Sequence, residues 1–279
     1  MNNPILIVCG EPNSVFSELI IKTFRKYKNE KPLVLIGSTK LIESQIKKLK
    51  LKCKLNLTYF INKKFVNLKK NKLNIIDINY NFTKPFEKIS SKSNKYIKES
   101  FDKALHIIKN NHTSGLINGP ISKKYFLKGK YNGITEYLSS KFNLKENYAM
   151  LIYNKSLSVS PITTHLPINR ISKKLNKSMI ISKVTLISKF YKKILSKKPK
   201  LIITGLNPHC ENFYGFSEEK KIIKPAISIL KRKKIDISGP IPADTAFFQQ
   251  NSKKYDVIIG MYHDQVLAPI KAIKGLDAI

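Results

Sequence analysis

Three of the five histidines in this 279-residue chain lie in short segments rich in small, turn-forming and acid or amide residues. These segments are Thr163–Pro167 with His165, Gly205–His209 with His209, and Met261–Gln265 with His263. Neutral imidazoles are usual ligands of zinc, and a catalytic zinc site takes three protein ligands and keeps one position open. A single histidine after a strand is more often structural, but here the arrangement occurs three times. The three histidines are therefore candidate metal ligands.

Each candidate histidine follows an apolar, β-prone run. The runs are Leu157–Ile162, Leu201–Thr204 and Val257–Met261. Ligands of open α/β sheets bind at the carboxyl ends of the strands, so a shared sheet would bring these histidines to one edge. The other two, His106 and His112, lie in or just after a lysine-rich helical stretch and are interpreted as structural or solvated.

Other residues could do chemistry but also have simpler roles. Gly119–Lys123 could bind an anion through backbone amides and a lysine, or form an ordinary strand-to-helix turn. Thr135 could cap a helix or offer a hydroxyl ligand, and Asp244 could cap a helix or face a cleft. Cys210 beside His209 could be a nucleophile, although a small packing residue is the favoured interpretation.

The elements that must position these residues alternate between strand and helix. Predicted strands are Pro4–Cys9, Pro32–Ile36, Cys53–Phe60, Leu73–Ile76 and Gly115–Asn118, besides the three apolar runs. Predicted helices are Ser17–Lys26, Leu41–Leu49 and Asn94–Asn110. This alternation predicts an α/β fold with mostly parallel, doubly wound sheets.

Net charge is the most unusual compositional feature. The formal charge of +34 suggests nucleic-acid binding, but only Arg25, Arg170 and Arg232 are arginine, the residue that best reads phosphates and bases. The lysines are scattered over predicted helices, which argues against a nucleic-acid partner and is typical of solvated faces. Such a field would still attract small anions.

Composition also narrows the location. No apolar run reaches the roughly 20 residues of a membrane span, and the N-terminus does not resemble a secretory signal. The three cysteines, Cys9, Cys53 and Cys210, lack the spacing of a disulfide framework or a cysteine zinc site. These features predict a cytoplasmic protein with no membrane association.

Taken in order, the motifs resemble the 4-hydroxythreonine-4-phosphate dehydrogenase family of pyridoxal phosphate biosynthesis. The motifs that carry this resemblance run across nearly the whole chain: Gly10–Pro12, Asn118–Lys123, Gly133–Glu136, Thr163–Pro167, Gly205–His209, Gly239–Thr245 and Met261–Gln265. Each motif alone is weak, but their joint order is specific.

The resemblance implies two α/β subdomains, 1–125 and 126–279, around a cleft in an isocitrate/isopropylmalate dehydrogenase-like fold. It implies that His165, His209 and His263 bind a divalent metal, with His263 contributed across a homodimer interface. Thr135 and Lys271 fall on substrate-contacting positions. Asp244, Asn207 and Asp264 are expected at or near the catalytic site, and no cofactor-binding residue is assigned.

The implied activity is NAD- or NADP-dependent oxidation and decarboxylation of 4-phosphooxy-L-threonine to 3-amino-2-oxopropyl phosphate, with zinc, cobalt or magnesium. The alternatives are a dehydrogenase of erythronate or threonate 4-phosphate, or an inactive truncated homologue. Ile134 stands where the family usually has a substrate-binding histidine, and Asn13–Ser17 replaces a glycine-rich continuation. The chain is expected to lack the C-terminal segment of the family.

Overall fold

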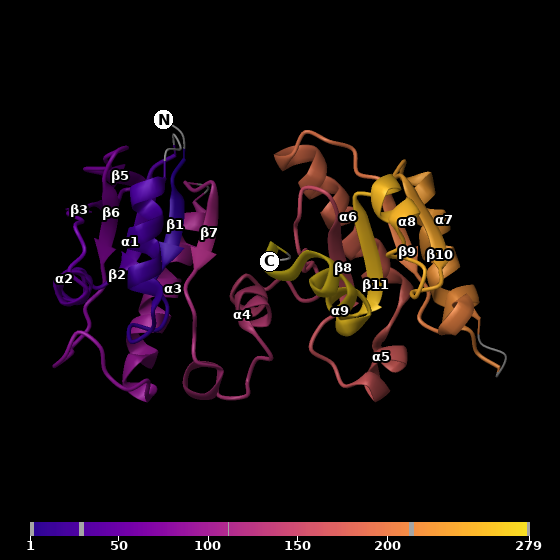
Figure 1. Ribbon diagram of the computed structural model, residues 1–279, viewed down its shortest axis with the longest axis horizontal. Helices are drawn as coiled ribbons and strands as arrows, with labels where there is room; N and C mark the ends of the chain where they lie inside the picture. The colour runs from indigo at the N-terminus through magenta and orange to yellow at the C-terminus, as the bar shows by residue number, and fades with distance from the viewer. Residues whose placement is uncertain (1–2, 28–30, 111, 212–214, 278–279) are drawn as a thin grey trace. The chain divides into compact units, whose positions relative to one another are not determined.

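The computed structural model describes residues 3–27, 31–110, 112–211 and 215–277. It divides into two compact units, Met1–Tyr131 and Asn132–Ile279. Each unit contains its own parallel sheet (Figure 1).

The sheet of the first unit has the strand order β3-β6-β2-β1-β7, and all its pairings are parallel. Its strands are β1 (Ile5–Val8), β2 (Leu33–Gly37), β3 (Leu55–Leu57), β6 (Leu73–Asp77) and β7 (Gly115–Asn118). Its main helices are α1 (Phe16–Lys26), α2 (Thr39–Lys48) and α3 (Asn94–Lys109). Alternate strand residues such as Ile7 and Leu35 pack with Ile21 of α1 and Ile42 of α2 in one apolar cluster.

One predicted strand of this unit is divided in the structure. The run Cys53–Phe60 forms β3 and, after Thr58, a separate strand β4 (Tyr59–Ile61). β4 pairs antiparallel with β5 (Lys64–Val66) as a small hairpin. The buried Thr58 donates its hydroxyl hydrogen to the Val66 carbonyl at 2.8 Å, which ties the hairpin to the end of β3.

The second unit carries a sheet of order β10-β9-β11-β8, again parallel throughout. Its strands are β8 (Ser158–Thr163), β9 (Leu201–Thr204), β10 (Ile237–Ile241) and β11 (Val257–Tyr262). Its helices are α4 (Ile134–Lys141), α5 (Ile168–Lys174), α6 (Lys177–Ile194), α7 (Lys224–Arg232), α8 (Gln249–Lys254) and α9 (His263–Lys274). The three predicted runs that precede candidate histidines are therefore adjacent strands of one sheet.

Helices cover both faces of this sheet. On one face, Ile203 and Ile259 pack with Val184 of α6 and Ile227 of α7. On the other face, Ile202 and Ile258 pack with Val266 and Ile270 of α9. Neighbouring residues of a strand point to opposite faces, so the consecutive apolar residues of β9 and β11 are typical of a sheet buried on both sides. The predicted α/β, doubly wound architecture is confirmed.

None of the described helices is both long and apolar enough to cross a lipid bilayer.

Candidate active site

His165 and His263 meet at the carboxyl edge of the second sheet. β8 and β11 are hydrogen-bonded neighbours, and their register pairs Thr163 with Tyr262, the last residue of each strand. The chain then continues to His165 on one side and His263 on the other. Their imidazole centroids are 5.7 Å apart, with 37° between the ring planes.

Each of these imidazoles has a carboxylate beside its Nδ1 atom. Nδ1 of His165 lies 3.1 Å from Oε1 of Glu136, and Nδ1 of His263 lies 2.7 Å from Oδ1 of Asp264. The His165 and His263 side chains remain 30% and 34% exposed, so a small ligand can reach both. An ionised carboxylate can only accept a hydrogen bond, so this arrangement favours a hydrogen on Nδ1 and a free lone pair on Nε2.

The backbone at His165 has an uncommon conformation. Its φ is 49°, in the left-handed region that residues other than glycine rarely adopt. The side-chain amide of Asn132 donates to the His165 carbonyl at 3.3 Å. His209 has a similar backbone, with φ 56°, in the short turn Pro208–Cys210 that follows β9.

Two adjacent glutamates hold the loop that leads to His209. Oε1 of Glu219 accepts hydrogen bonds from the backbone amides of Leu206 and Asn207 at 2.8 and 2.9 Å. The Asn207 side-chain amide donates to Glu218 Oε2 at 2.9 Å and to Glu219 Oε2 at 3.0 Å. Ser172 donates its hydroxyl hydrogen to Glu218. The predicted near-site residue Asn207 therefore anchors its own loop.

Both glutamates are ionised in spite of their burial. Burial raises the pKa of Glu219, but hydrogen bonds from Asn207 and Leu206 outweigh it and leave the pKa below its usual value. Burial also raises the pKa of Glu218, and hydrogen bonds from Ser172 and Asn207 again bring it below the usual value. The Glu219 residue is 0% exposed, so hydrogen bonds from Leu206 and Asn207 take the place of water around its charge.

Gln265 connects the ends of β9 and β11. Its Oε1 accepts from the Met261 amide at 2.6 Å and from the Thr204 hydroxyl at 2.9 Å. Its Nε2 donates to the Gly205 carbonyl at 2.8 Å. The glycine is required there, because a Cβ on Gly205 would lie 2.7 Å from Sγ of Cys210. One buried amide thus fixes the starts of two histidine-bearing segments relative to each other.

The remaining predicted site residues differ in their surroundings. Thr135 is half-buried in the first turn of α4, but Gly133 occupies the N-cap position, so the predicted cap role of Thr135 is wrong. Asp244 is exposed and does not cap α8, which begins after Phe248. Lys271 is exposed in the last turn of α9.

Cys210 does not have the surroundings of a nucleophilic thiolate. Burial raises the pKa of its thiol, and the carboxylates of Glu219 and Asp244 raise it further. A nucleophilic cysteine needs the opposite shift. Its Sγ instead fills the space beside Gly205, in agreement with the packing interpretation.

The described residues do not assemble a complete metal site by themselves. Within the described ranges, no group of three or more histidine, cysteine, aspartate or glutamate side chains is arranged to hold a metal ion. His165 and His263 form a pair, whereas the three-histidine set predicted from the sequence stays a prediction. The two remaining histidines, His106 and His112, lie in the first unit against the ring of Phe60.

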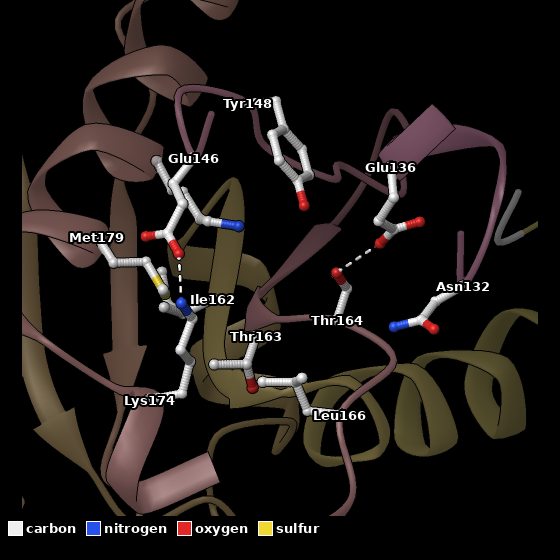
Figure 2. Close-up of a pocket in the computed structure, with 11 residues that line it drawn as sticks. Asn132, Glu136, Glu146, Tyr148, Ile162, Thr163, Thr164, Leu166, Lys174 and Met179 are labelled. Atoms are coloured by element: carbon white, nitrogen blue, oxygen red, sulfur yellow. Dashed lines mark hydrogen bonds and ion pairs between the residues drawn. The ribbon is translucent and has the colours of Figure 1, made fainter. Parts of the chain in front are cut away.

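A cavity of about 130 Å³ lies next to the His165 loop (Figure 2). Its wall includes Glu136, whose Oε1 accepts the Thr164 hydroxyl hydrogen at 3.0 Å, and Glu146, which pairs with Lys174 at 2.7 Å. Lys183 of α6 also lines the cavity and is only 4% exposed. Its Nζ lies 4.8 Å from the centroid of the Tyr148 ring, and burial lowers its pKa.

In the first unit, two of the glycine motifs contact each other. The Glu11 amide donates to the Pro120 carbonyl at 2.7 Å, and a Cβ on Gly10 would lie 2.3 Å from that oxygen. The Gly119 amide is also engaged, because it donates to the Val8 carbonyl at 2.7 Å. The turn after β7 is thus a structural junction with β1, which favours the simpler interpretation of Gly119–Lys123.

Comparison with known proteins decides the family. A family model described as "Pyridoxal phosphate biosynthetic protein PdxA" matches residues 28–279. The chain belongs to the PdxA family. The protein is accordingly an oxidoreductase of the PdxA type.

Individual PdxA relatives agree with this assignment. The 4-hydroxythreonine-4-phosphate dehydrogenase of Sulfurihydrogenibium sp. is 34% identical over 274 residues, covering 96% of this chain and 83% of the relative. The D-threonate 4-phosphate dehydrogenase of Pectobacterium atrosepticum is 33% identical over 150 residues, 53% of this chain and 46% of the relative.

A solved structure supports the fold. The crystal structure of 4-hydroxythreonine-4-phosphate dehydrogenase from Klebsiella pneumoniae has a TM-score of 0.81 at 24% identity, covering 98% of this chain and 86% of that one. PdxA enzymes share the isocitrate/isopropylmalate dehydrogenase-like fold, so the predicted fold class is confirmed.

Sequence reasoning assigned no role to several residues that shape this PdxA site. The histidine-bearing loops are held by Glu136, Glu218, Glu219 and Gln265. The sequence pattern alone predicts no supporting role for any of the four. One signal was available: acidic residues are scarce, at 18 of 279, so a Glu218-Glu219 pair amid lysines marks a position with a specific use.

Proposed function

We propose that this chain oxidises and decarboxylates 4-phosphooxy-L-threonine to 3-amino-2-oxopropyl phosphate, with NAD or NADP and a divalent metal. Membership of the PdxA family and the name of the Sulfurihydrogenibium relative support the reaction. The observation that carries the assignment to particular residues is the pair of imidazoles at the ends of β8 and β11.

The His165–His263 pair suits a divalent ion such as zinc or cobalt. Because a zinc–nitrogen bond is about 2.0–2.1 Å, two imidazoles on one ion have centroids within roughly 6 Å of each other. The His165 and His263 centroids, 5.7 Å apart, satisfy this limit. We assign His209 as the third ligand, since it ends the loop that Glu219 and Gln265 fix beside the same strands.

The chemistry has two stages. The hydroxyl-bearing carbon of the substrate loses a hydride and its oxygen loses a proton, which gives a 3-keto acid that then releases CO2. NAD or NADP supplies the hydride acceptor, and a divalent ion supplies a Lewis acid that lowers the hydroxyl pKa and stabilises negative charge on that oxygen during decarboxylation.

The protein side chains bind and orient the substrate. We assign Thr135 and Lys271 to the phosphate group, which gives binding energy away from the reacting carbon. Asp264 orients His263, and Asn207 fixes the loop that carries His209. We place the exposed carboxylate of Asp244 near the reacting groups, because it acts electrostatically on Cys210, which adjoins His209.

A second substrate class has specific support. Ile134 at the start of α4 can neither donate a hydrogen bond nor carry charge, and one relative is named a D-threonate 4-phosphate dehydrogenase. A phosphorylated erythronate or threonate is therefore the alternative substrate. Formation of NADH with these acids and none with 4-phosphooxy-L-threonine would select it.

The test of the main proposal measures NADH or NADPH formation at neutral pH. Chelator-treated protein should be inactive with 4-phosphooxy-L-threonine, and zinc, cobalt or magnesium should restore turnover. His165→Ala, His209→Ala and His263→Ala should each lower kcat/KM at least 100-fold. Full activity of folded, chelated protein would contradict the metal assignment.

We further propose a homodimer. The family resemblance implies that His263 completes the site of the partner subunit, whereas the His165–His263 pair within one chain supports a separate site in each chain. Coexpression of His165→Ala with His263→Ala distinguishes the two arrangements. If sites are shared, mixed dimers contain one intact site and recover activity. If each chain binds its own metal, every site lacks one ligand and the mixture stays inactive.

A further inference from the structure

Glu136 makes polar contacts with the candidate metal ligand His165 and with the residue before it. Its Oε1 atom accepts from the Thr164 hydroxyl at 3.0 Å and lies 3.1 Å from Nδ1 of His165. The Glu136 side chain is 18% exposed, whereas that of His165 is 30% exposed. A single carboxylate oxygen from α4 thus holds two consecutive residues of the loop after β8.

The space around this contact leaves the imidazole little freedom. A Cβ on Gly133 would lie 3.2 Å from Cε1 of His165 and 3.1 Å from Oε2 of Glu136. The Gly133 backbone therefore packs against both partners. Asn132 also donates its side-chain amide to the His165 carbonyl at 3.3 Å. Asn132 and Gly133, which immediately precede α4, thus contact the loop of this histidine together with Glu136.

We infer that Glu136 is a positioning residue that fixes His165 with Nδ1 protonated and Nε2 facing the metal position. The inference rests on the proposed function for its metal. A carboxylate accepts only, so the hydrogen of the neutral ring lies on Nδ1, and the lone pair on Nε2 is left free. Carboxylate partners of ligating histidines fix the tautomer and ring direction, and their loss typically weakens metal binding about 10–100-fold.

The same logic distinguishes Glu136 from the other acid of the cavity wall. Glu146 pairs with Lys174 at 2.7 Å, and among the described residues it makes no polar contact with His165. Its side chain is 50% exposed. Glu146→Ala is therefore a matched control for Glu136→Ala, because it removes the same groups from the same cavity without touching the histidine.

The first test measures zinc affinity by competition with a chelating dye. Glu136→Ala should bind zinc about 10–100-fold more weakly than the unaltered protein. Glu136→Gln retains an acceptor oxygen and should lose less. Glu146→Ala should stay within twofold of the unaltered protein. The inference would be overturned if a folded Glu136→Ala variant bound zinc within twofold of the unaltered protein. If the alanine variant does not fold, the zinc affinity of Glu136→Gln is compared with the unaltered protein instead.

The second test is independent of metal and of activity. Long-range proton–nitrogen NMR of metal-free protein with ¹⁵N-labelled histidine, at pH 8, reports which ring nitrogen carries hydrogen. The His165 signals are those missing from the spectrum of His165→Ala. In the unaltered protein they should show hydrogen on Nδ1, and in Glu136→Ala they should show a mixture of the two tautomers. Hydrogen on Nε2 in the unaltered protein would refute the inference. Failure of the unaltered protein to bind zinc would contradict the proposed function, while the NMR result would still decide the role of Glu136.

Discussion

The imidazoles of His165 and His263 are neighbours in space because Thr163 and Tyr262 are paired in the register of β8 and β11. The two strands end at the same level, so each delivers its histidine to the same edge of the sheet. A one-residue slip would move one strand end by about 3.3 Å and turn its side chains to the opposite face. The histidine pair therefore depends on strand register as much as on the loops.

Metal binding should stabilise the protein through this pair. Adding zinc to chelator-treated protein should raise the melting temperature, since a ligand at 100 times its Kd contributes about 2.7 kcal/mol to the folded state. His165→Ala and His263→Ala should remove most of this shift in scanning calorimetry. His106→Ala, a change beside Phe60 in the first unit, should retain it. An undiminished shift in both site variants would contradict the paired-ligand assignment.

Gly133→Ala should weaken zinc binding about tenfold, as is typical when a ligating histidine loses its hydrogen-bonded carboxylate. The added Cβ would press on Cε1 of His165 at 3.2 Å and on Oε2 of Glu136 at 3.1 Å, so one of them must move. Unfolding free energy should fall by only about 1 kcal/mol, as for other changes at a helix N-cap. Chelator competition measures the affinity. Gly115→Ala, which adds a Cβ in open space, is the control.

Glu219→Gln should lower the unfolding free energy by about 2–4 kcal/mol, because buried donors on Leu206 and Asn207 lose a charged acceptor. The pKa of Glu219 is below its usual 4.5, so its ionised form stabilises the fold above pH 4.5 and that stabilisation disappears as pH falls through the lowered pKa.

Urea denaturation between pH 7 and pH 3 tests this prediction. The unaltered protein should lose stability over this range more steeply than Glu219→Gln. The partly exposed Glu99, paired with Lys95, supplies the control, and Glu99→Gln should change stability by less than about 1 kcal/mol. If the unfolding free energies of Glu219→Gln and the unaltered protein fall equally with pH, the Glu219 carboxylate does not cause the loss of stability in acid.

Lys183→Met should stabilise the protein at neutral pH by about 1–4 kcal/mol, the range found when buried ion pairs are replaced by apolar side chains. Burial lowers the pKa of Lys183 below its usual 10.5, so the unfolded chain binds this proton more tightly than the folded one. The buried ammonium group therefore lowers the unfolding free energy at low pH, and this destabilisation disappears as pH rises from the lowered pKa to 10.5.

Denaturation at pH 7 and pH 10 measures the difference. The advantage of Lys183→Met should shrink at the higher pH. The exposed Lys189 lies on the same helix, and Lys189→Met should give no comparable gain. A loss of stability in Lys183→Met at neutral pH would mean that the contact with the Tyr148 ring outweighs the cost of burying the ammonium group.

Much of the fold follows from local pattern. Apolar strands buried on both faces, such as Leu201–Thr204, can be read directly because each is short, continuous and followed by a turn. The division of Cys53–Phe60 could not be read, because the hairpin partner of Tyr59–Ile61 is chosen by tertiary pairing. Residue types likewise suggested Thr135 as a helix cap, whereas α4 begins one residue earlier, with Gly133 at the N-cap.

The candidate histidines could be singled out from the sequence, but the residues that hold their loops could not. Histidines after strands stand out in a sequence, since few other residues bind metals so readily. A glutamate that holds a loop looks like any helix-start acid, so Glu136 and Glu219 acquire meaning only when their acceptor atoms are seen beside distant donors. The buried Lys183 was hidden in a chain where lysine usually marks solvent.

The burial of Glu11, Glu218 and Glu219 has an effect outside the site. These residues belong to a set of only 18 acids, so turning them inward leaves the solvent-facing surface still richer in ammonium groups than the net charge of +34 conveys. Salt screens such a surface over about 8 Å at physiological ionic strength. The encounter rate with a phosphorylated anion should therefore depend on the surrounding electrolyte, with every abundant polyanion of the cell competing for the same lysines.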